Sequence, residues 1–250
     1  MRYFIKLAYN GTPFFGWQRQ PEQITVQEIV ERAFSLLLRD EVAITGCGRT
    51  DTGVHASEYF AHFDYKQTLT EEEREKLVFK LNAFLPKEIV IYHIYMMQDD
   101  AHARFDAISR SYRYHVELAK NPFTFHFAHR VYEKLSIEKM NEASEILLNT
   151  TDFTSFSKVH TQVNNFNCKV THAQWILQND QLQFEITADR FLRNMVRAIV
   201  GTTLDVGRGK MSLDQFREAI EKKNRSATGT SVPAHALFLE NVRYPDDFKL

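Results

Sequence analysis

The residues with the clearest chemical potential lie within one stretch, residues 46–55. Its only carboxylate is Asp51, and Arg49 stands two residues earlier. Residues i and i+2 point to the same side of an extended backbone, so we expect Arg49 near Asp51, where a guanidinium favours the ionised carboxylate. A permanently charged carboxylate suits a nucleophile or a charge stabiliser. Glycines predict a sharply bent loop here, because they permit positive φ or close backbone approach; a plain hairpin turn is the alternative. These glycines are Gly46, Gly48 and Gly53.

Two other chemistries match the same loop. The triplet at residues 51–53 spells the Asp-Thr-Gly of aspartic proteases, which need two carboxylates that share one proton, but the chain has no second such triplet. A metal site could combine Asp51, His55 and His62, yet their spacing is not typical of zinc or iron sites. We therefore predict no metal, with His62 packed beside the core and His55 in the loop, able to touch substrate.

Composition indicates an ordinary globular protein. The chain has 250 residues, 44% hydrophobic and 25% charged, enough for one large domain or two small ones. Two cysteines, Cys47 and Cys168, do not make a disulfide framework, which predicts a cytoplasmic protein. No secretory signal is apparent, and no apolar run approaches the ~20 residues of a membrane span. Net charge is −1, but residues 189–225 hold nine basic and five acidic residues, which suits one basic face for nucleic acid.

Hydrophobic periodicity and helix-capping pairs predict the element order of the first hundred residues. The order is β-α-β-β-α-β, that of a ferredoxin-like unit. Strands are expected at residues 3–9, 41–45, 58–64 and 89–95, and helices at residues 25–38 and 70–84. Between the first strand and helix, Phe14, Phe15 and Trp17 precede Arg19. These aromatic residues could stack on a nucleotide, although we expect most of them to plug the end of the sheet.

The second half resembles an enlarged copy of the first. A strand over 109–116 puts Tyr112 and Tyr114 on one face and Arg113 on the other. A helix over 191–204 would carry Arg193 and Arg197 on one face. The remaining expected elements are helices at 136–148 and 212–223, an anchored turn at 152–156, a polar loop at 158–167, a hairpin of 173–177 and 182–188 around Asn179-Asp180, and a strand at 238–242.

These elements predict the α+β fold class. We expect two ferredoxin-like (RRM-like) halves that share a continuous, mostly antiparallel sheet flanked by helices. The expected domains are residues 1–105, which carry the catalytic loop, and residues 106–250.

A family resemblance emerges from the order of the motifs. Residues 48–55 read Gly-Arg-Thr-Asp-Thr-Gly-Val-His and resemble the catalytic loop of the tRNA pseudouridine synthase A family, which usually reads Gly-Arg-Thr-Asp-x-Gly-Val-His. Further similar motifs follow in the family's order over nearly the whole chain, at residues 15–20, 102–105, 112–114, 152–156 and 195–201. So many ordered matches are specific, and they imply the pseudouridine synthase fold.

The resemblance implies an isomerase that converts uridine to pseudouridine at positions 38, 39 and 40 of the tRNA anticodon stem-loop, without a cofactor. Asp51 would be the catalytic carboxylate, and both attack on C1′ and removal of a C2′ proton remain open. Tyr112 would hold the detached uracil, and Arg197 would pair with the carboxylate. Arg49 would assist base flipping.

The resemblance also implies RNA contacts and a dimer. One contact segment comprises Ala101, His102, Ala103, Arg104 and Phe105, in which Ala101 replaces a common Phe. Lys158 lies in a second contact region whose composition departs from familiar members. Further candidates for RNA contact are Arg19, His55, Tyr112 and Arg193. Family members are homodimers in which one tRNA lies across both subunits.

Two alternative functions stay open at this stage. One is a pseudouridine synthase for a different RNA site, and the other is a non-catalytic RNA-binding module on the same scaffold. The joint presence of Asp51, Arg49, Tyr112 and Arg197 favours an enzyme, because simple binding does not require an anionic side chain facing phosphates.

Overall fold

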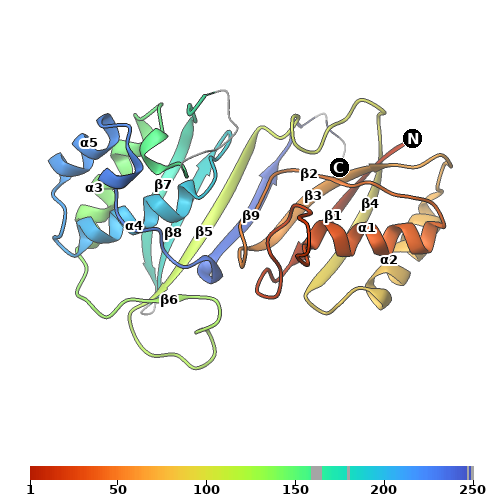
Figure 1. Ribbon diagram of the computed structural model, residues 1–250, viewed down its shortest axis with the longest axis horizontal. Coiled ribbons are helices and arrows are strands. Elements are labelled where there is room, and N and C mark those ends of the chain that lie inside the picture. Colours follow the sequence, from red (N-terminus) through yellow and green to blue (C-terminus); the bar gives the residue numbers. More distant parts are fainter. Residues whose placement is uncertain (159–164, 179–180, 247, 249–250) are drawn as a thin grey trace. The chain divides into compact units, whose positions relative to one another are not determined.

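The computed structural model of the protein describes residues 1–158, 165–178, 181–246 and 248 (Figure 1). The chain forms two compact units. The first unit is Met1–Ile108 together with Leu239–Leu250, and the second is Ser109–Phe238. The last strand, β9 (Leu237–Arg243), therefore belongs mainly to the first unit although it follows the second unit in the sequence.

The first unit has the predicted β-α-β-β-α-β order. Its strands are β1 (Arg2–Tyr9), β2 (Thr45–Gly46), β3 (His55–Asp64) and β4 (Ile89–Met97), and its helices are α1 (Val26–Leu38) and α2 (Glu71–Phe84). The strand order is β4-β1-β3-β9, with β2 beside β3. Strand β1 is antiparallel to both neighbours, so that Ile5 lies between Ala61 and Ile94. This order confirms the ferredoxin-like prediction for the first hundred residues.

Both faces of this sheet are covered, which explains why β1 is buried along most of its length. On the face that α1 covers, the ring of Phe63 lies 4.9 Å from that of Phe34 and 5.4 Å from that of Tyr3. On the opposite face Phe4 packs against His62 and Tyr244. Alternate residues of one strand thus enter two separate layers.

The bounds predicted for the second strand, residues 41–45, are wrong. Only Thr45 and Gly46 form strand β2. The backbone N–H of Val42 donates to Ser35 Oγ at 2.9 Å, and that of Ile44 donates to Glu31 Oε1 at 3.0 Å. Because side chains of α1 take these donors, the segment does not enter a strand ladder.

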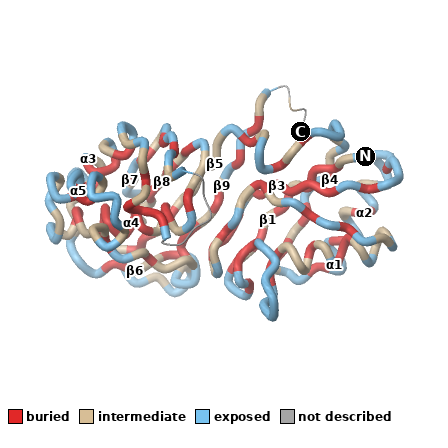
Figure 2. Tube along the Cα trace, turned by 45° about the horizontal axis from the view of Figure 1, so that its top comes forward, coloured by how far each residue is buried: buried red, intermediate tan, exposed pale blue. Residues whose placement is uncertain are grey.

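The second unit is a three-stranded antiparallel sheet with added helices. Strands β5 (Ser109–Glu117), β8 (Gln181–Ala188) and β7 (Val170–Gln178) pair in that order, and β6 (His129–Arg130), which the sequence did not predict, pairs parallel with β5. The helices are α3 (Ile137–Leu148), α4 (Met195–Gly207) and α5 (Leu213–Glu221), with short 3-10 turns at Thr154–Phe156, Arg225–Ala227 and Ala234–Ala236. Helix α4 is buried along most of its length (Figure 2).

The helix predicted from residue 191 begins instead at Met195, so the prediction that Arg193 and Arg197 share a helix face is wrong. Asn194 has left-handed backbone geometry, with φ of 66°, which interrupts helical continuity before α4. The carbonyl of Arg193 accepts a hydrogen bond from Lys158 N at 3.1 Å. The predicted turn at Asn179-Asp180 and residues 159–164 of the polar loop lie outside the described residues.

The predicted α+β class, with mostly antiparallel strands flanked by helices, is confirmed. Cys47 and Cys168 are both buried and form no disulfide. In the part of the chain that the structure describes, no helix has the length and apolar character needed to cross a membrane.

Candidate active site

The candidate catalytic loop connects β2 to β3 and carries Asp51 at the start of a tight turn. Val54 N donates to Asp51 O at 3.1 Å, which closes a turn over residues 51–54. Gly53 has φ of 77° at the third position of this turn, a conformation that a residue with a Cβ adopts only under strain. At the other end of the loop, Cys47 N donates to Phe60 O at 2.8 Å. Asp51 is half-buried within this fixed backbone.

A second segment, residues 11–17, packs directly on the loop. Trp17 N donates to Thr50 O, and Gly53 N donates to Phe14 O, both at 3.3 Å. Gly16 has φ of 85°, and a Cβ added there would lie 2.4 Å from Thr50 O. Only glycine permits this approach. The residues flanking Asp51 are thus bonded to the neighbouring segment on both sides.

Three aromatic side chains pack together beneath the loop backbone and support it, two of them through hydrogen bonds. Trp17 and Tyr59 stack with ring centroids 4.1 Å apart, and Tyr9 packs against both. The two tyrosine hydroxyls bind the loop directly: Tyr9 OH lies 2.9 Å from Thr50 Oγ1, and Tyr59 OH donates to Gly48 O. All three residues are buried. Trp17 therefore plugs the sheet, as predicted for most of the early aromatic residues.

The other two early aromatic residues differ in their burial. Phe14 is buried, whereas Phe15 is 44% exposed.

The prediction that the loop glycines adopt positive φ or allow close backbone approach holds at Gly53. It is wrong at Gly48, whose φ is not positive and whose Cβ position has nothing within 4 Å. That position has room for a side chain.

Arg49 and Arg19, two basic candidates of the first unit, are both exposed. The guanidinium of Arg19 lies 3.5 Å from Glu31 Oε2, which ties it to α1. Contact of either residue with RNA stays a prediction.

Two histidines near the loop are buried and use a ring nitrogen within the fold. His55 begins β3, is 1% exposed and accepts from Gly11 N at 3.1 Å through Nδ1, so its prediction as a loop residue is wrong. His62 is buried beside the core, as predicted, and its Nδ1 accepts from Ala103 N at 3.1 Å. Among the described residues, no three His, Cys, Asp or Glu side chains are arranged to hold a metal ion.

The segment of residues 101–105 presents only part of its length to solvent. Ala101 and Ala103 are buried and His102 is half-buried, whereas Arg104 and Phe105 are exposed. Of the five, Arg104 and Phe105 are therefore the side chains best placed to reach RNA. Contact of Ala101, His102 and Ala103 with RNA stays a prediction.

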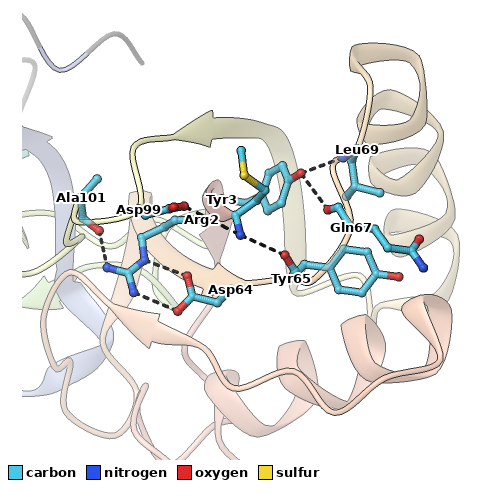
Figure 3. A network of polar contacts seen from close by, with 9 residues as sticks. Arg2, Tyr3, Asp64, Tyr65, Gln67, Leu69, Asp99 and Ala101 are labelled. Atoms are coloured by element: carbon cyan, nitrogen blue, oxygen red, sulfur yellow. Dashed lines mark hydrogen bonds and ion pairs between the residues drawn. The ribbon is translucent and has the colours of Figure 1, made fainter.

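Arg2 ties the start of this segment to the sheet (Figure 3). Its guanidinium donates two hydrogen bonds to the Asp64 carboxylate, both at 2.9 Å, and a third to Ala101 O at 2.9 Å. The hydrogen bonds from Arg2 lower the pKa of Asp64. This paired network links β1, β3 and the segment after β4.

In the second unit Tyr112 lies on β5 opposite Ile186 of β8 and is half-buried. Its ring meets that of Phe191 edge-on, with centroids 5.1 Å apart and planes at 87°. Tyr114, on the same face, is fully buried and donates to Pro233 O at 3.0 Å. Arg113 points to the other face and pairs with Glu185 at 2.9 Å. The predicted alternation along this strand is confirmed.

Arg197 is the third residue of α4 and is half-buried. Its Nε donates to Val232 O at 2.8 Å, and Val232 N donates back to Arg197 O at 3.2 Å. The first bond restricts the direction of the guanidinium, and the second ties the backbone of Arg197 to the same residue. Lys158 and Arg193 are exposed and lie next to each other, because their backbones are bonded.

The predicted turn at residues 152–156 lies beside Lys158. Asp152 Oδ1 accepts from Thr154 N at 3.0 Å, and its other oxygen pairs with Lys223 at 2.9 Å. Phe153 and Phe156 are fully buried. These two rings are the aromatic anchors that the sequence predicted.

Comparison with known proteins adds the decisive observation. A family described as tRNA pseudouridine synthase matches residues 143–245. The tRNA pseudouridine synthase A of Parabacteroides distasonis is 51% identical over 98% of this chain and 97% of its own. That of Porphyromonas gingivalis is 52% identical over 100% and 99%, and that of Bacillus subtilis is 39% identical over 98% and 99%. The chain belongs to the tRNA pseudouridine synthase A family. Since pseudouridine synthases are isomerases, it is an enzyme of that class.

Membership of the tRNA pseudouridine synthase A family confirms the resemblance, but the sequence missed the residues that support the motifs. Arg2, Tyr9 and Tyr59 hold the candidate loop or the 101–105 segment, and each is a strand residue without a motif of its own. Tyr9 and Tyr59 fell within predicted strands, and Arg2 lay just before one; a strand prediction does not indicate a hydrogen bond to a loop.

Proposed function

We propose that this chain isomerises uridine to pseudouridine at positions 38, 39 and 40 of the tRNA anticodon stem-loop. As a member of the tRNA pseudouridine synthase A family it modifies tRNA, and full-length identity of up to 52% to relatives of that name supports the same substrate. The observation that carries the catalytic assignment is the mounting of Asp51. Its carboxylate stands on a turn whose backbone is bonded at Thr50 and Gly53 to the neighbouring segment.

Asp51 is the proposed catalytic group because of the charge that the reaction develops. When the N1–C1′ bond breaks, the ribose carbon becomes electron-poor, and a fixed carboxylate beside it stabilises the transition state. The uracil then turns, C5 bonds to C1′, and the C5 proton is lost while N1 gains one. The atoms balance without an oxidant, a reductant or added water, so the proposal includes no cofactor. The same carboxylate serves either attack on C1′ or removal of the C2′ proton.

Three further residues have proposed catalytic roles. Tyr112 stacks on the detached uracil, and its hydroxyl assists removal of the C5 proton. Arg197 pairs with the catalytic carboxylate; its bonds to Val232 restrict the guanidinium and so support a positioning function. Arg49 fills the space that the flipped nucleotide vacates. The exposure of Arg49 on the loop is compatible with that role.

RNA binding is proposed for exposed side chains of both units. Arg104, Phe105 and Arg19 supply the first unit's contacts, and Lys158 and Arg193 those of the second. Each lysine or arginine that neutralises a phosphate releases counterions, so affinity for tRNA should fall steeply with salt. His55, which is buried, is proposed to act by shaping the loop that contacts RNA.

The enzyme is further proposed to work as a cytoplasmic homodimer with one tRNA across both subunits. A dimer enlarges the basic surface that a single chain of net charge −1 supplies sparingly.

The test is to incubate the enzyme with tRNA transcripts that keep a uridine at only one of positions 38, 39 and 40, and to map pseudouridine by chemical labelling. We expect modification at each position. A transcript with cytidine at all three positions is the matched control and should stay unmodified. Modification at another uridine would favour a synthase for a different site. Binding without any pseudouridine would favour the non-catalytic module.

A further inference from the structure

We propose that His102 and His62 are positioning residues whose unprotonated Nδ1 atoms hold the backbone of residues 103–105, and so present Arg104 and Phe105 to tRNA. The proposal rests on the proposed function of this segment as an RNA contact. It goes further by assigning the two histidines a role other than touching RNA.

Three consecutive backbone donors end on two imidazole rings. His102 Nδ1 accepts from Arg104 N at 3.1 Å and from Phe105 N at 3.3 Å. His62 Nδ1 accepts from Ala103 N at 3.1 Å. A neutral imidazole offers one acceptor nitrogen, and a protonated imidazole offers none. The conformation of this segment therefore requires both Nδ1 atoms to be unprotonated.

Other hydrogen bonds fix the two ends of the turn and its middle. His102 N donates to Asp106 Oδ2 at 2.6 Å, and Asp106 N donates back to His102 O at 3.1 Å. Tyr244 OH donates to Ala103 O at 2.5 Å, and Arg2 holds Ala101 O (Figure 3). With this backbone bonded on both sides, Arg104 and Phe105 are the side chains that remain exposed.

The two exposed side chains are ordered by the same ring. The His102 and Phe105 rings have centroids 4.2 Å apart, and the Arg104 guanidinium lies 5.6 Å from the centre of the Phe105 ring. An aromatic ring can stack on a base while a guanidinium beside it neutralises a phosphate. His102 thus controls both the backbone and the packing of the pair.

Burial and the neighbouring guanidinium of Arg2 favour the neutral form of each histidine, against the opposing charges of nearby carboxylates. The two rings meet edge-on with centroids 4.6 Å apart; Arg2 and Arg104 supply positive charge nearby, and Asp64 and Asp106 supply negative charge. Burial, followed by the charge of Arg2, lowers the pKa of His62 to about 4 and lowers the pKa of His102. Near neutral pH both Nδ1 atoms can therefore accept.

Acidification then separates this role from a simple electrostatic contact. A histidine that touches phosphates gains charge as pH falls, which raises affinity for RNA. Protonation of His102 Nδ1 instead sets a donor against the N–H groups of Arg104 and Phe105 and opens the turn. The positioning role therefore predicts that tRNA affinity falls at acidic pH, whereas a direct phosphate contact predicts that it rises.

The experiment compares His102→Leu, which removes the acceptor, with His102→Asn, whose Oδ1 can accept the same N–H groups and does not titrate. Affinity for tRNA, KM and kcat are measured at several pH values from about 7.5 down to about 4.5, because both pKa values lie below the usual value for histidine. Thermal melting at each pH first shows that each variant is folded. We expect His102→Leu to raise KM about tenfold with kcat nearly unchanged. A tenfold change corresponds to the net contribution of roughly one hydrogen bond. His102→Asn should keep the wild-type KM near pH 7.5 and lose the weakening on acidification.

Equal KM for His102→Leu and wild type, failure of His102→Asn to restore KM, or tighter wild-type binding at acidic pH would each overturn the inference. Arg104→Ala and Phe105→Ala, measured in parallel, test the proposed contact itself. If neither changes tRNA affinity, the contact assignment fails. If both weaken binding while His102→Leu does not, only the positioning role fails.

Discussion

Replacing Gly16 by alanine should displace the candidate catalytic loop without touching any reacting group. Gly16 has φ of 85°, and an added Cβ would lie 2.4 Å from Thr50 O and 3.2 Å from the carbonyl carbon of Asp51. Both neighbours are backbone atoms of the loop, so no side-chain rotation relieves the overlap.

Two costs combine at this position. An alanine in left-handed geometry costs about 1–2 kcal/mol, and overpacking of a tight site costs about 1–3 kcal/mol. The free energy of unfolding should therefore fall by about 2–5 kcal/mol if the loop stays in place. If the loop moves instead, stability is partly restored, but a shift of about 1 Å at Asp51 should lower kcat about 100-fold.

Urea unfolding, turnover of tRNA and hydrogen exchange of the loop peptide separate these results. Gly48→Ala is the matched control, because that glycine has open space at its Cβ position and no positive φ. Its free energy of unfolding should stay within about 0.5 kcal/mol of wild type. A Gly16→Ala protein as stable, as active and as protected from exchange as wild type would refute this account of the loop.

Three further predictions follow from packing, capping and burial. Because the pKa of His62 is about 4 in the folded protein and near 6.5 in an unfolded chain, the unfolded state binds more protons between these values. Stability should thus fall by up to about 3 kcal/mol as pH drops from 6.5 to 4, and His62→Asn should remove that slope in urea titrations at several pH values. Thr70→Ala breaks the capping box with Glu73 and should cost about 1 kcal/mol, seen as a lower melting temperature. Phe184→Ala, beside Trp175 in the core of the second unit, should cost about 3–5 kcal/mol in urea unfolding.

Local signals predicted most elements, since their physical cause lies within a few residues. The pairs Thr70 with Glu73 and Ser212 with Gln215 form reciprocal capping boxes, and both helices begin where those pairs predict. Alternation along β5 placed Tyr112 and Tyr114 on one face because strand geometry has a period of two. The division into domains 1–105 and 106–250 stays a prediction.

The failures arose where distant side chains decide the backbone. Val42 and Ile44 read as strand residues, but Ser35 and Glu31 of α1 take their N–H groups. Arg193 fits a helical period, yet Asn194, whose Nδ2 donates to Ser231 Oγ at 2.6 Å, has left-handed geometry and the helix starts later. Neither contact has a signature in the neighbouring sequence.

In the candidate site, the sequence likewise predicted the chemical groups but not the contacts that hold them. The type and spacing of the residues in the loop motif identified Asp51, because a motif records chemistry directly. They did not predict that His55 and His62 are backbone acceptors, since their donors, Gly11 and Ala103, lie 44 and 41 residues away in the chain. The donors to His102 are local, at Arg104 and Phe105, but the motif indicated an RNA contact there rather than a backbone acceptor. The proposed partnership of Asp51 with Tyr112 and Arg197 came from the family resemblance and stays a proposal.

The most direct test of the central claim is tritium release from tRNA labelled at C5 of uridine, measured with the Asp51→Asn enzyme. The Asp51 carbonyl that closes the turn is backbone, so the loop should keep its shape. The exposed carboxylate of Asp214 offers the control Asp214→Asn. We predict that Asp51→Asn lowers release at least about 1000-fold while tRNA affinity persists, and that Asp214→Asn releases tritium at the wild-type rate. Undiminished release by Asp51→Asn would contradict the proposal that this carboxylate acts on the ribose.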